Sequence, residues 1–324
     1  MPVARRRFLA ILASLGIAAT LAPDHARAQD RPLQIVATTG MIADAVRGVG
    51  GERVEVMALM GPGVDPHGYR QTSSDIARMS RADAVFWHGL YLEAQLEEFL
   101  GQLSQRRPVI ALAEALPKDR IIQDAQNRGR YDPHVWMDPG LWTGVVDAAA
   151  RELSRIDPAG AQVYAANAAT YRAEVEAIGD YASGVLASVP ADDRVLVTAH
   201  DAFAYFGRAY GYEVLAIQGI STQSEAGLQR IEALVDTLVE RRIGAIFVES
   251  SVSDRNLRAL IEGAAARGHT VTIGGELFSD AMGRPGSYEG TYVGMIDHNA
   301  SVIAEALGGS VPAGGASGRL GEES

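Results

Sequence analysis

The chain has 324 residues and a formal net charge of −11 at pH 7, and 47% of its residues are hydrophobic. This length predicts one large domain or two of moderate size, with enough apolar sequence for a sizeable core. The acidic composition, with a pI near 5.1, excludes the basic face on which nucleic-acid binding depends. The absence of cysteine excludes disulfides, thiolate metal ligands and cysteine nucleophiles, and we expect no lipid anchor on cysteine.

The N-terminus is typical of a secretory signal peptide over residues 1–28. It has a basic start, an apolar run from Phe8 to Ala22, and the A-x-A cleavage pattern at 26–28. The apolar run is too short for a membrane span. The residues at 5–9, RRRFL, fit twin-arginine export, and the general secretory route is equally open. Because no second apolar run reaches membrane length, we expect a soluble mature protein in a bacterial periplasm.

Strands and helices are predicted to alternate along the mature chain. Short apolar runs predict strands at 33–39, 53–60, 82–89, 108–113, 194–200, 212–218, 243–250 and 269–275. Amphipathic stretches predict helices at 73–81, 93–103, 223–242 and 254–268. Apolar strands separated by helices are typical of parallel sheets that are covered on both faces. We therefore predict an α/β fold with two lobes, each with a mainly parallel four-stranded sheet.

A long helix is predicted to join the two lobes over residues 158–189. Apolar residues at alternating steps of four and three form one stripe, made by Tyr164, Ala168, Tyr171, Val175, Ile178, Ala182 and Val185. About 30 residues at ~1.5 Å each give a rod of roughly 45 Å, which would act as a stiff strut that Gly179 and Gly184 weaken somewhat. The lobes are then assigned to 29–157 and 190–307. The Gly-, Ser- and Pro-rich segment 308–324 is expected to be a disordered tail.

The tripeptide Asp-Pro-His occurs twice, at 65–67 and at 132–134, in a chain with only seven histidines. Proline fixes its own φ and holds the preceding residue in an extended conformation, so each loop presents its histidine from a stiffened backbone. Each aspartate is suited to accept a hydrogen bond from an imidazole N–H. A single copy would be read as an ordinary turn with an incidental histidine. Two copies in similar positions favour a binding role.

Four side chains are expected to converge between the lobes, because ligands of open α/β sheets bind at the carboxyl ends of strands. His67 follows the second strand, His200 closes the first strand of the second lobe, and Asp280 follows the last strand. His134 precedes a helix that starts near Leu141. Three imidazoles and one carboxylate suit a divalent transition metal, so the sequence predicts a metal site made of His67, His134, His200 and Asp280.

The remaining histidines are weaker candidates. His25 leaves with the signal peptide, His88 is expected to be a structural histidine near the cleft, and His269 and His298 are expected to have no role in the site. Glu249, at a strand end, is either a substitute for Asp280 or a supporting carboxylate, and the second role is favoured.

Two other function classes are compatible with the same ligands. A secreted metallohydrolase would need an open coordination position for water and a general base. An adhesin-like protein would hold the metal as a structural element. The sequence contains no G-x-S-x-G elbow and no dinucleotide G-x-G-x-x-G fingerprint. It favours capture of a metal over catalysis.

Several stretches resemble the TroA-like group of zinc and manganese receptors of bacterial ABC importers. They are GPGVDPHGY, ADAVFWHGLYLE, DPHVWMDP, VTAHDAFAYFGRAYG, QGISTQSEAG and GGELFSDAMG with GTYVGMIDHN, and the resemblance covers residues 33–307. It implies two lobes joined by one long helix, with the metal held in the cleft by His67, His134, His200 and Asp280. It also implies that the protein is no enzyme and delivers its ion to a membrane permease powered by an ATPase.

The identity of the metal stays open between Zn²⁺ and Mn²⁺. Manganese-selective relatives often carry Glu where this chain has His200, and a third imidazole moves the site toward zinc on ligand softness. His88 stands where relatives often have Asn, and the segment before His134 lacks the His-rich loop of many zinc receptors. We expect a monomer that carries one ion.

Overall fold

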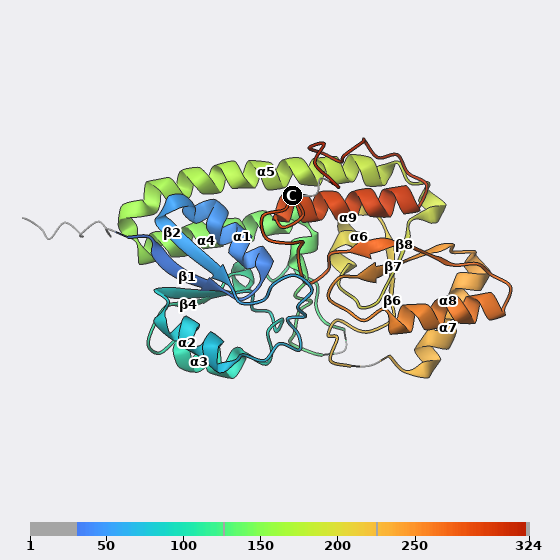
Figure 1. Cartoon of the computed structure of the whole chain (residues 1–324), viewed down its shortest axis with the longest axis horizontal. Coiled ribbons are helices and arrows are strands. Elements are labelled where there is room, and N and C mark those ends of the chain that lie inside the picture. The colour runs from blue at the N-terminus through green and yellow to red at the C-terminus, as the bar shows by residue number, and fades with distance from the viewer. Residues whose placement is uncertain (1–30, 126, 225, 322–324) are drawn as a thin grey trace, which may run out of the picture. The chain divides into compact units, whose positions relative to one another are not determined.

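The computed structural model describes residues 31–125, 127–224 and 226–321, so the predicted signal peptide lies outside the described residues. From Arg31 onward the chain forms two α/β lobes, which lie to the left and the right in Figure 1. The predicted fold class, α/β with parallel sheets in two lobes, is confirmed. Within the described ranges no helix has the length and apolarity needed to cross a membrane.

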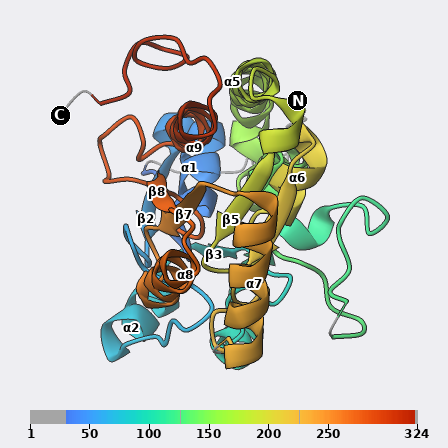
Figure 2. The same cartoon turned by 90° about the vertical axis from the view of Figure 1, so that its right-hand side faces the viewer.

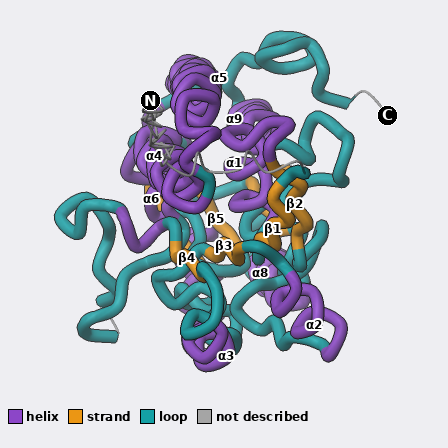
Figure 3. Tube along the Cα trace, turned by 90° about the vertical axis from the view of Figure 1, so that its left-hand side faces the viewer, coloured by secondary structure: helices purple, strands orange, loops and turns teal. Residues whose placement is uncertain are grey.

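The first lobe contains a parallel four-stranded sheet in the order β2-β1-β3-β4. Its strands are β1 (Leu33–Ala37), β2 (Val54–Ala58), β3 (Ala84–Trp87) and β4 (Val109–Ala111), and its helices are α1 (Gly40–Gly50), α2 (Ser73–Arg81), α3 (Glu97–Leu103) and α4 (Pro139–Ile156). Alternate side chains of β1 point to opposite faces. Ile35 joins the core formed with α1 and α4, whereas Val36 packs with Met79 of α2. Helices therefore cover both faces, as Figure 3 shows.

The second lobe differs from the predicted four-stranded sheet. Its strands form two parallel pairs, β5 (Val195–Thr198) with β6 (Glu213–Ala216) and β7 (Ala245–Glu249) with β8 (Thr272–Leu277). Strand β5 lies next to β7 without a backbone ladder. Beyond the end of β5, the side chain of Glu249, rather than a backbone carbonyl, accepts the amide hydrogen of His200. The four strands therefore form two pairs rather than the predicted single sheet, and a side chain joins the ends of the central strands.

Helices also cover both faces of the strands in this lobe. They are α6 (Ala204–Tyr210), α7 (Leu228–Arg241), α8 (Arg255–Ala266) and α9 (Tyr292–Ala306). Val197 and Ile246 pack under α7 and α8, which lie in front in Figure 2. Leu196 and Phe247 point to the opposite side, where they join a core that also contains residues of the first lobe.

Helix α5 (Ala161–Ala187) has 27 residues and runs along both lobes, with α9 beside it (Figure 1). It packs on α1 and α4 of the first lobe and on α9 and α6 of the second. Its buried residues include the whole predicted stripe, from Tyr164 to Val185. Because one continuous core includes Met41 of α1 and Leu277 of β8, the two lobes share their interior rather than meeting only at the helix.

Residues 308–321 differ from the disordered tail expected over 308–324, of which 322–324 lie outside the described residues. Residues 308–321 form a loop in which the Ala316 amide donates to Asp297 Oδ2 of α9 at 2.9 Å. A Cβ at Gly315 would lie 2.5 Å from the Asp297 carboxylate, so glycine permits this close approach. The Arg319 guanidinium lies over the Tyr288 ring. The composition of this segment indicated disorder. Composition gives no information about an acceptor elsewhere in the chain, such as the buried Asp297 carboxylate.

The two glycines of α5 give a matched test of the helix. Nothing lies within 4 Å of a Cβ built at the exposed Gly184, whereas a Cβ at Gly179 would lie 3.1 Å from Pro139 Cβ. Gly184→Ala should therefore stabilise the protein by up to about 1 kcal/mol, because alanine favours helix. Gly179→Ala should stabilise the protein less than Gly184→Ala, or destabilise it, because its Cβ would press against Pro139. Urea denaturation of both variants measures the difference, and equal effects would contradict the packing described.

Candidate metal centre

The four predicted ligands lie together at the junction of the lobes. The potential ligand atoms of His67, His134, His200 and Asp280 all lie within 4.8 Å of one another, and all four side chains are buried. His200 Nε2 is 3.1 Å from Asp280 Oδ2, and His134 Nε2 is 3.3 Å from Asp280 Oδ1. His67 Nε2 is 3.3 Å from His134 Nε2. The carboxylate of Asp280 is thus surrounded by imidazole nitrogens.

The first Asp-Pro-His loop follows β2 and fixes the backbone at His67. Asp65 Oδ1 accepts the His67 amide hydrogen at 2.8 Å, closing a local turn. Asp65 Oδ2 accepts from the Thr222 hydroxyl of the second lobe at 2.6 Å. In this copy the aspartate bonds to the backbone of its histidine and to the second lobe, and the predicted hydrogen bond to the imidazole is not among the contacts of Asp65.

The second Asp-Pro-His loop fixes both the backbone and the ring of its histidine. Asp132 Oδ1 accepts from the His134 amide at 3.0 Å and contacts His134 Nδ1 at 2.7 Å, which confirms the predicted bond to the imidazole. His88, predicted to be structural, is fully buried, and its Nε2–H donates to the Pro133 carbonyl at 2.7 Å. Asp138 then caps α4, whose first residue is Pro139.

Two strand ends of the second lobe supply the other two predicted ligands. His200 follows β5, and Glu249 at the end of β7 accepts from the His200 amide at 2.9 Å and contacts His200 Nδ1 at 2.5 Å. Glu249 is therefore a supporting carboxylate, as favoured by the sequence. Asp280 follows β8, and the preceding Ser279 carbonyl accepts from Trp136 Nε1 at 2.8 Å. This bond ties the Asp280 segment to the His134 loop.

Glu93 is a supporting residue that sequence reasoning missed. Its buried Oε1 accepts from the Thr38 hydroxyl at 2.6 Å and from the His88 amide at 2.8 Å. Glu93 thereby fixes the position of His88, whose ring holds the Pro133 carbonyl. In the sequence, the only indication of this supporting role is that Glu93, in the stretch ADAVFWHGLYLE, is an acidic residue after a buried strand.

Burial and charge shift the pKa values of the four groups in different directions. Burial lowers the pKa of His67 to about 3, so this imidazole is neutral. Burial also lowers the pKa of His134, but Asp132 and Asp280 outweigh it and raise the pKa to about 9. In the same way, Glu249 and Asp280 raise the His200 pKa well above its usual value. Burial raises the pKa of Asp280, but His200 and His134 outweigh it and hold that pKa well below its usual range.

The donor set fits a divalent transition metal. Both carboxylate oxygens of Asp280 and Nε2 of His200 are buried and lack a hydrogen-bond partner within the described residues. Buried groups of this kind are normally satisfied, because an unsatisfied group costs its full desolvation energy. With Nδ1 of His134 and His200 engaged by carboxylates, their Nε2 atoms face Asp280. A cation among these atoms would satisfy all of them, and the nitrogen-rich set suits zinc or manganese.

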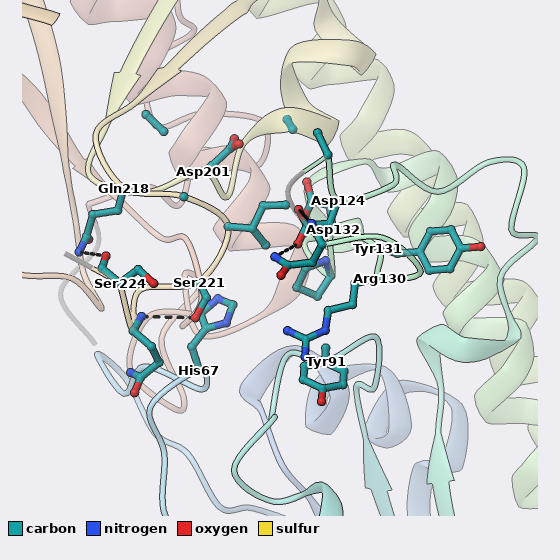
Figure 4. A pocket seen from close by; sticks show the side chains of 18 of the residues that line it. His67, Tyr91, Asp124, Arg130, Tyr131, Asp132, Asp201, Gln218, Ser221 and Ser224 are labelled. Atoms are coloured by element: carbon teal, nitrogen blue, oxygen red, sulfur yellow. Dashed lines mark hydrogen bonds between the residues drawn. The ribbon is translucent and has the colours of Figure 1, made fainter. Parts of the chain in front are cut away.

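A pocket of about 990 Å³ lies between the lobes (Figure 4). Its lining includes Tyr91, Arg130 and Asp132 of the first lobe and Ser221 and Ser224 of the second. Of the four predicted ligands, His67 alone lines it. His67 is therefore the ligand nearest to the route by which an ion could reach the site.

Comparisons with known proteins agree with this geometry. A family model described as "ZnuA: Zinc-uptake complex component A periplasmic" matches residues 35–306. The manganese-binding lipoprotein MntA of Bacillus subtilis is 45% identical over 281 residues, which cover 87% of this chain and 92% of that protein. The metal ABC transporter substrate-binding lipoprotein SloC of Streptococcus mutans is 28% identical, with 92% of this chain and 98% of that protein covered.

A solved structure is also similar. The periplasmic zinc-binding protein TroA from Treponema pallidum superposes with a TM-score of 0.83 at 42% sequence identity, and the match covers 85% of this chain and 99% of that one.

The raised pKa of His134 predicts how stability depends on pH in the chelated, metal-free protein. A histidine with a folded-state pKa of about 9 and an ordinary value of 6.5 stabilises the fold fully below pH 6.5. This contribution is lost as the pH rises through 9. The free energy of unfolding of wild type relative to His134→Gln should therefore decrease between those pH values. Urea denaturation in chelator measures it, with His298→Gln as the control; a pH-independent difference would contradict the prediction.

Proposed function

This chain belongs to the ZnuA family of periplasmic zinc-uptake components, and we propose that it captures one Zn²⁺ or Mn²⁺ ion and delivers it to an ABC importer. The observation that carries the proposal is the buried convergence of three imidazoles on a carboxylate whose two oxygens have no hydrogen-bond partner. His67, His134, His200 and Asp280 would be the ligands of the ion. The ion is the cargo of the protein.

Capture is a better interpretation than catalysis. Four protein ligands complete a tetrahedral zinc shell, whereas a catalytic zinc keeps a position open for water. A hydrolase also needs a general base, but the carboxylates of Asp132 and Glu249 that touch the site are each bonded to an imidazole. MntA and TroA carry the names of metal-binding proteins, and SloC is named as a substrate-binding lipoprotein of a metal ABC transporter. We therefore propose that the protein is a receptor and not a metallohydrolase.

The proposed ligand set is expected to bind both metals, with a different affinity for each. Zn²⁺ stands above Mn²⁺ in the general order of affinities, and imidazole nitrogens favour the softer ion. The similar proteins include one named for manganese and one for zinc. We propose that the receptor binds Zn²⁺ more tightly than Mn²⁺. The ion it carries in the cell then depends on the supply of each metal and on the permease.

The partners follow from the receptor role. We propose that the mature protein is exported through its signal peptide, 1–28, and works in the periplasm as a monomer. The lobes at 29–157 and 190–307, joined by the helix at 158–189, would present the loaded cleft to a membrane permease that a cytoplasmic ATPase drives. SloC bears the name of a substrate-binding lipoprotein of such a transporter.

Metal titration of the chelated mature protein tests the ligand assignment. Wild type should bind one Zn²⁺ per chain, and His67→Ala or His200→Ala should weaken binding by more than about 100-fold, since loss of even a supporting residue costs 10–100-fold. Circular dichroism should show that both variants keep their fold. His298→Ala, whose ring contacts the Glu276 carbonyl and the Phe278 ring, is the control. Binding as tight as wild type in both His134→Ala and Asp280→Ala would show that the assignment is wrong.

The same titration separates the receptor from a protein with a structural metal. A receptor should remain folded without metal and gain modest stability on binding, whereas a structural metal site unfolds when the metal is removed. Competition between Zn²⁺ and Mn²⁺, with measurement of the metal content after purification, then ranks the two ions.

Trp136 should report binding through its fluorescence. Its ring centroid is 5.2 Å from that of His134, and its Nε1–H is bonded to the carbonyl of Ser279, next to Asp280. A metal bound between these ligands should change the emission of this buried indole. Trp136→Phe should abolish the change while Trp87 and Trp142 remain. A constant emission during saturation of the site would argue against a bound ion next to the His134 loop.

A further inference from the structure

We propose that Asp132 and Asp201 form an entry site at the wall of the pocket between the lobes, where a hydrated divalent cation binds before it reaches the four buried ligands. This inference rests on the proposed function of metal capture and deepens it, since it assigns a second position, made of oxygen atoms, to the incoming ion. The observations that carry it are a buried carboxylate oxygen without a partner, a second carboxylate within reach of its charge, and the pocket that both line.

Asp132 has one oxygen that the cluster of four ligands does not use. Its Oδ1 accepts from the His134 amide and contacts the His134 ring, whereas its Oδ2 is buried and has no hydrogen-bond partner within the described residues. A buried carboxylate oxygen is costly unless a cation or an ordered water compensates for its lost hydration. Because the side chain is only 1% exposed and lines the pocket, that compensating group would lie at the pocket wall (Figure 4).

Asp201 brings a second carboxylate to the same pocket. It directly follows His200, and its amide donates to the Gly219 carbonyl at 3.3 Å, so its backbone is fixed beyond the end of β5. Its carboxylate lines the pocket and accepts no hydrogen bond from the described residues. Burial and the charge of Asp132 raise the pKa of Asp201, whereas His134 and His200 lower it. Asp201 therefore lies within electrostatic reach of both Asp132 and two of the proposed ligands.

The two arginines of the pocket lining are engaged elsewhere. Arg230 donates through Nε and Nη2 to the Ala216 carbonyl at 3.1 and 2.6 Å, and it is the weakest of the groups that lower the pKa of Asp201. Arg130 lies 3.7 Å over the centre of the Tyr91 ring, as Figure 4 shows. Among the described residues neither arginine forms an ion pair with the two carboxylates of the entry site. This pair therefore keeps the negative charge that attracts a cation.

Oxygen atoms suit the first step of capture. A divalent ion arrives with its water shell, and carboxylates can hold such an ion while it keeps several waters. The buried imidazoles replace that shell afterwards, and His67, which lines the same pocket, is the first of them along the route. Carboxylate and water ligands suit Mg²⁺, whereas imidazoles suit zinc. Mg²⁺ should therefore occupy the entry site without displacing Zn²⁺ from the buried ligands.

The test measures how fast the chelated, full mature protein takes up Zn²⁺, with a fluorescent zinc indicator in a stopped-flow instrument. Asp201→Asn keeps the size of the side chain, removes its charge and leaves the four proposed ligands in place. Uptake should slow by about 10-fold at low ionic strength, the lower end of the effect of electrostatic steering. The difference should shrink in ~1 M salt, where the Debye length is about 3 Å. Asp201→Glu, which retains the charge, should take up Zn²⁺ at close to the wild-type rate.

Release into excess chelator separates an entry site from a charge that only stabilises the bound ion. Asp201→Asn should release Zn²⁺ no faster than wild type, because the entry site holds the ion only in transit. Mg²⁺ gives an independent readout: at matched ionic strength it should slow Zn²⁺ uptake by wild type and have no such effect on Asp201→Asn. Unchanged uptake by wild type in Mg²⁺, or an effect of Asp201→Asn on release alone, would overturn the entry site.

Asp180→Asn is the matched control, because Asp180 is an exposed residue of α5 outside the pocket lining and its substitution changes the net charge by the same amount. Its uptake rate should equal that of wild type. Equal uptake by wild type and Asp201→Asn, or equal slowing in both aspartate variants, would overturn the role of Asp201 while the receptor function stands. Absence of Zn²⁺ and Mn²⁺ binding by wild type in the initial titration would overturn both.

Discussion

The structure depends on the burial of one carboxylate, Asp280, among three imidazoles. A buried carboxylate without hydrogen-bond donors is stable only next to positive charge, so the site is built to hold a cation. The surrounding residues keep this geometry. Asp132 and Glu249 each contact Nδ1 of one histidine, which directs its Nε2 toward Asp280. Such outer contacts fix the orientation of an imidazole and increase its basicity as a ligand.

The scaffold supports this arrangement from both lobes. Strand ends deliver His200 and Asp280, and capped turns deliver His67 and His134, so each ligand begins from a restrained backbone. Helix α5 and the shared core then fix the distance between the two lobes. A site that is organised before the ion arrives loses little conformational entropy on binding. Thr222 of the second lobe also donates to Asp65 in the loop of His67, so a polar contact joins the two lobes beside the site.

The sequence predicted all four members of the cluster because their positions follow from local rules. A side chain directly after a parallel strand lies at the ligand-binding edge, and proline restrains the residue before it. The two Asp-Pro-His copies nevertheless differ in a way that no local pattern contains. Asp132 Oδ1 contacts its own histidine ring, whereas Asp65 Oδ2 faces Thr222, 157 positions away in the chain. The divided sheet of the second lobe and the C-terminal loop that contacts Asp297 also differed from expectation.

The coordination set by itself discriminates weakly between metals, because imidazoles and a carboxylate bind many divalent ions. The ion with the highest intrinsic affinity is favoured, whichever metal the cell requires. The carboxylates behind the imidazoles strengthen binding of each of these ions further. A receptor built this way therefore faces a problem of release, since four buried ligands hold their ion tightly. Of the four proposed ligands, His67 alone lines the pocket between the lobes, so it is the ligand nearest to the route by which the ion would leave.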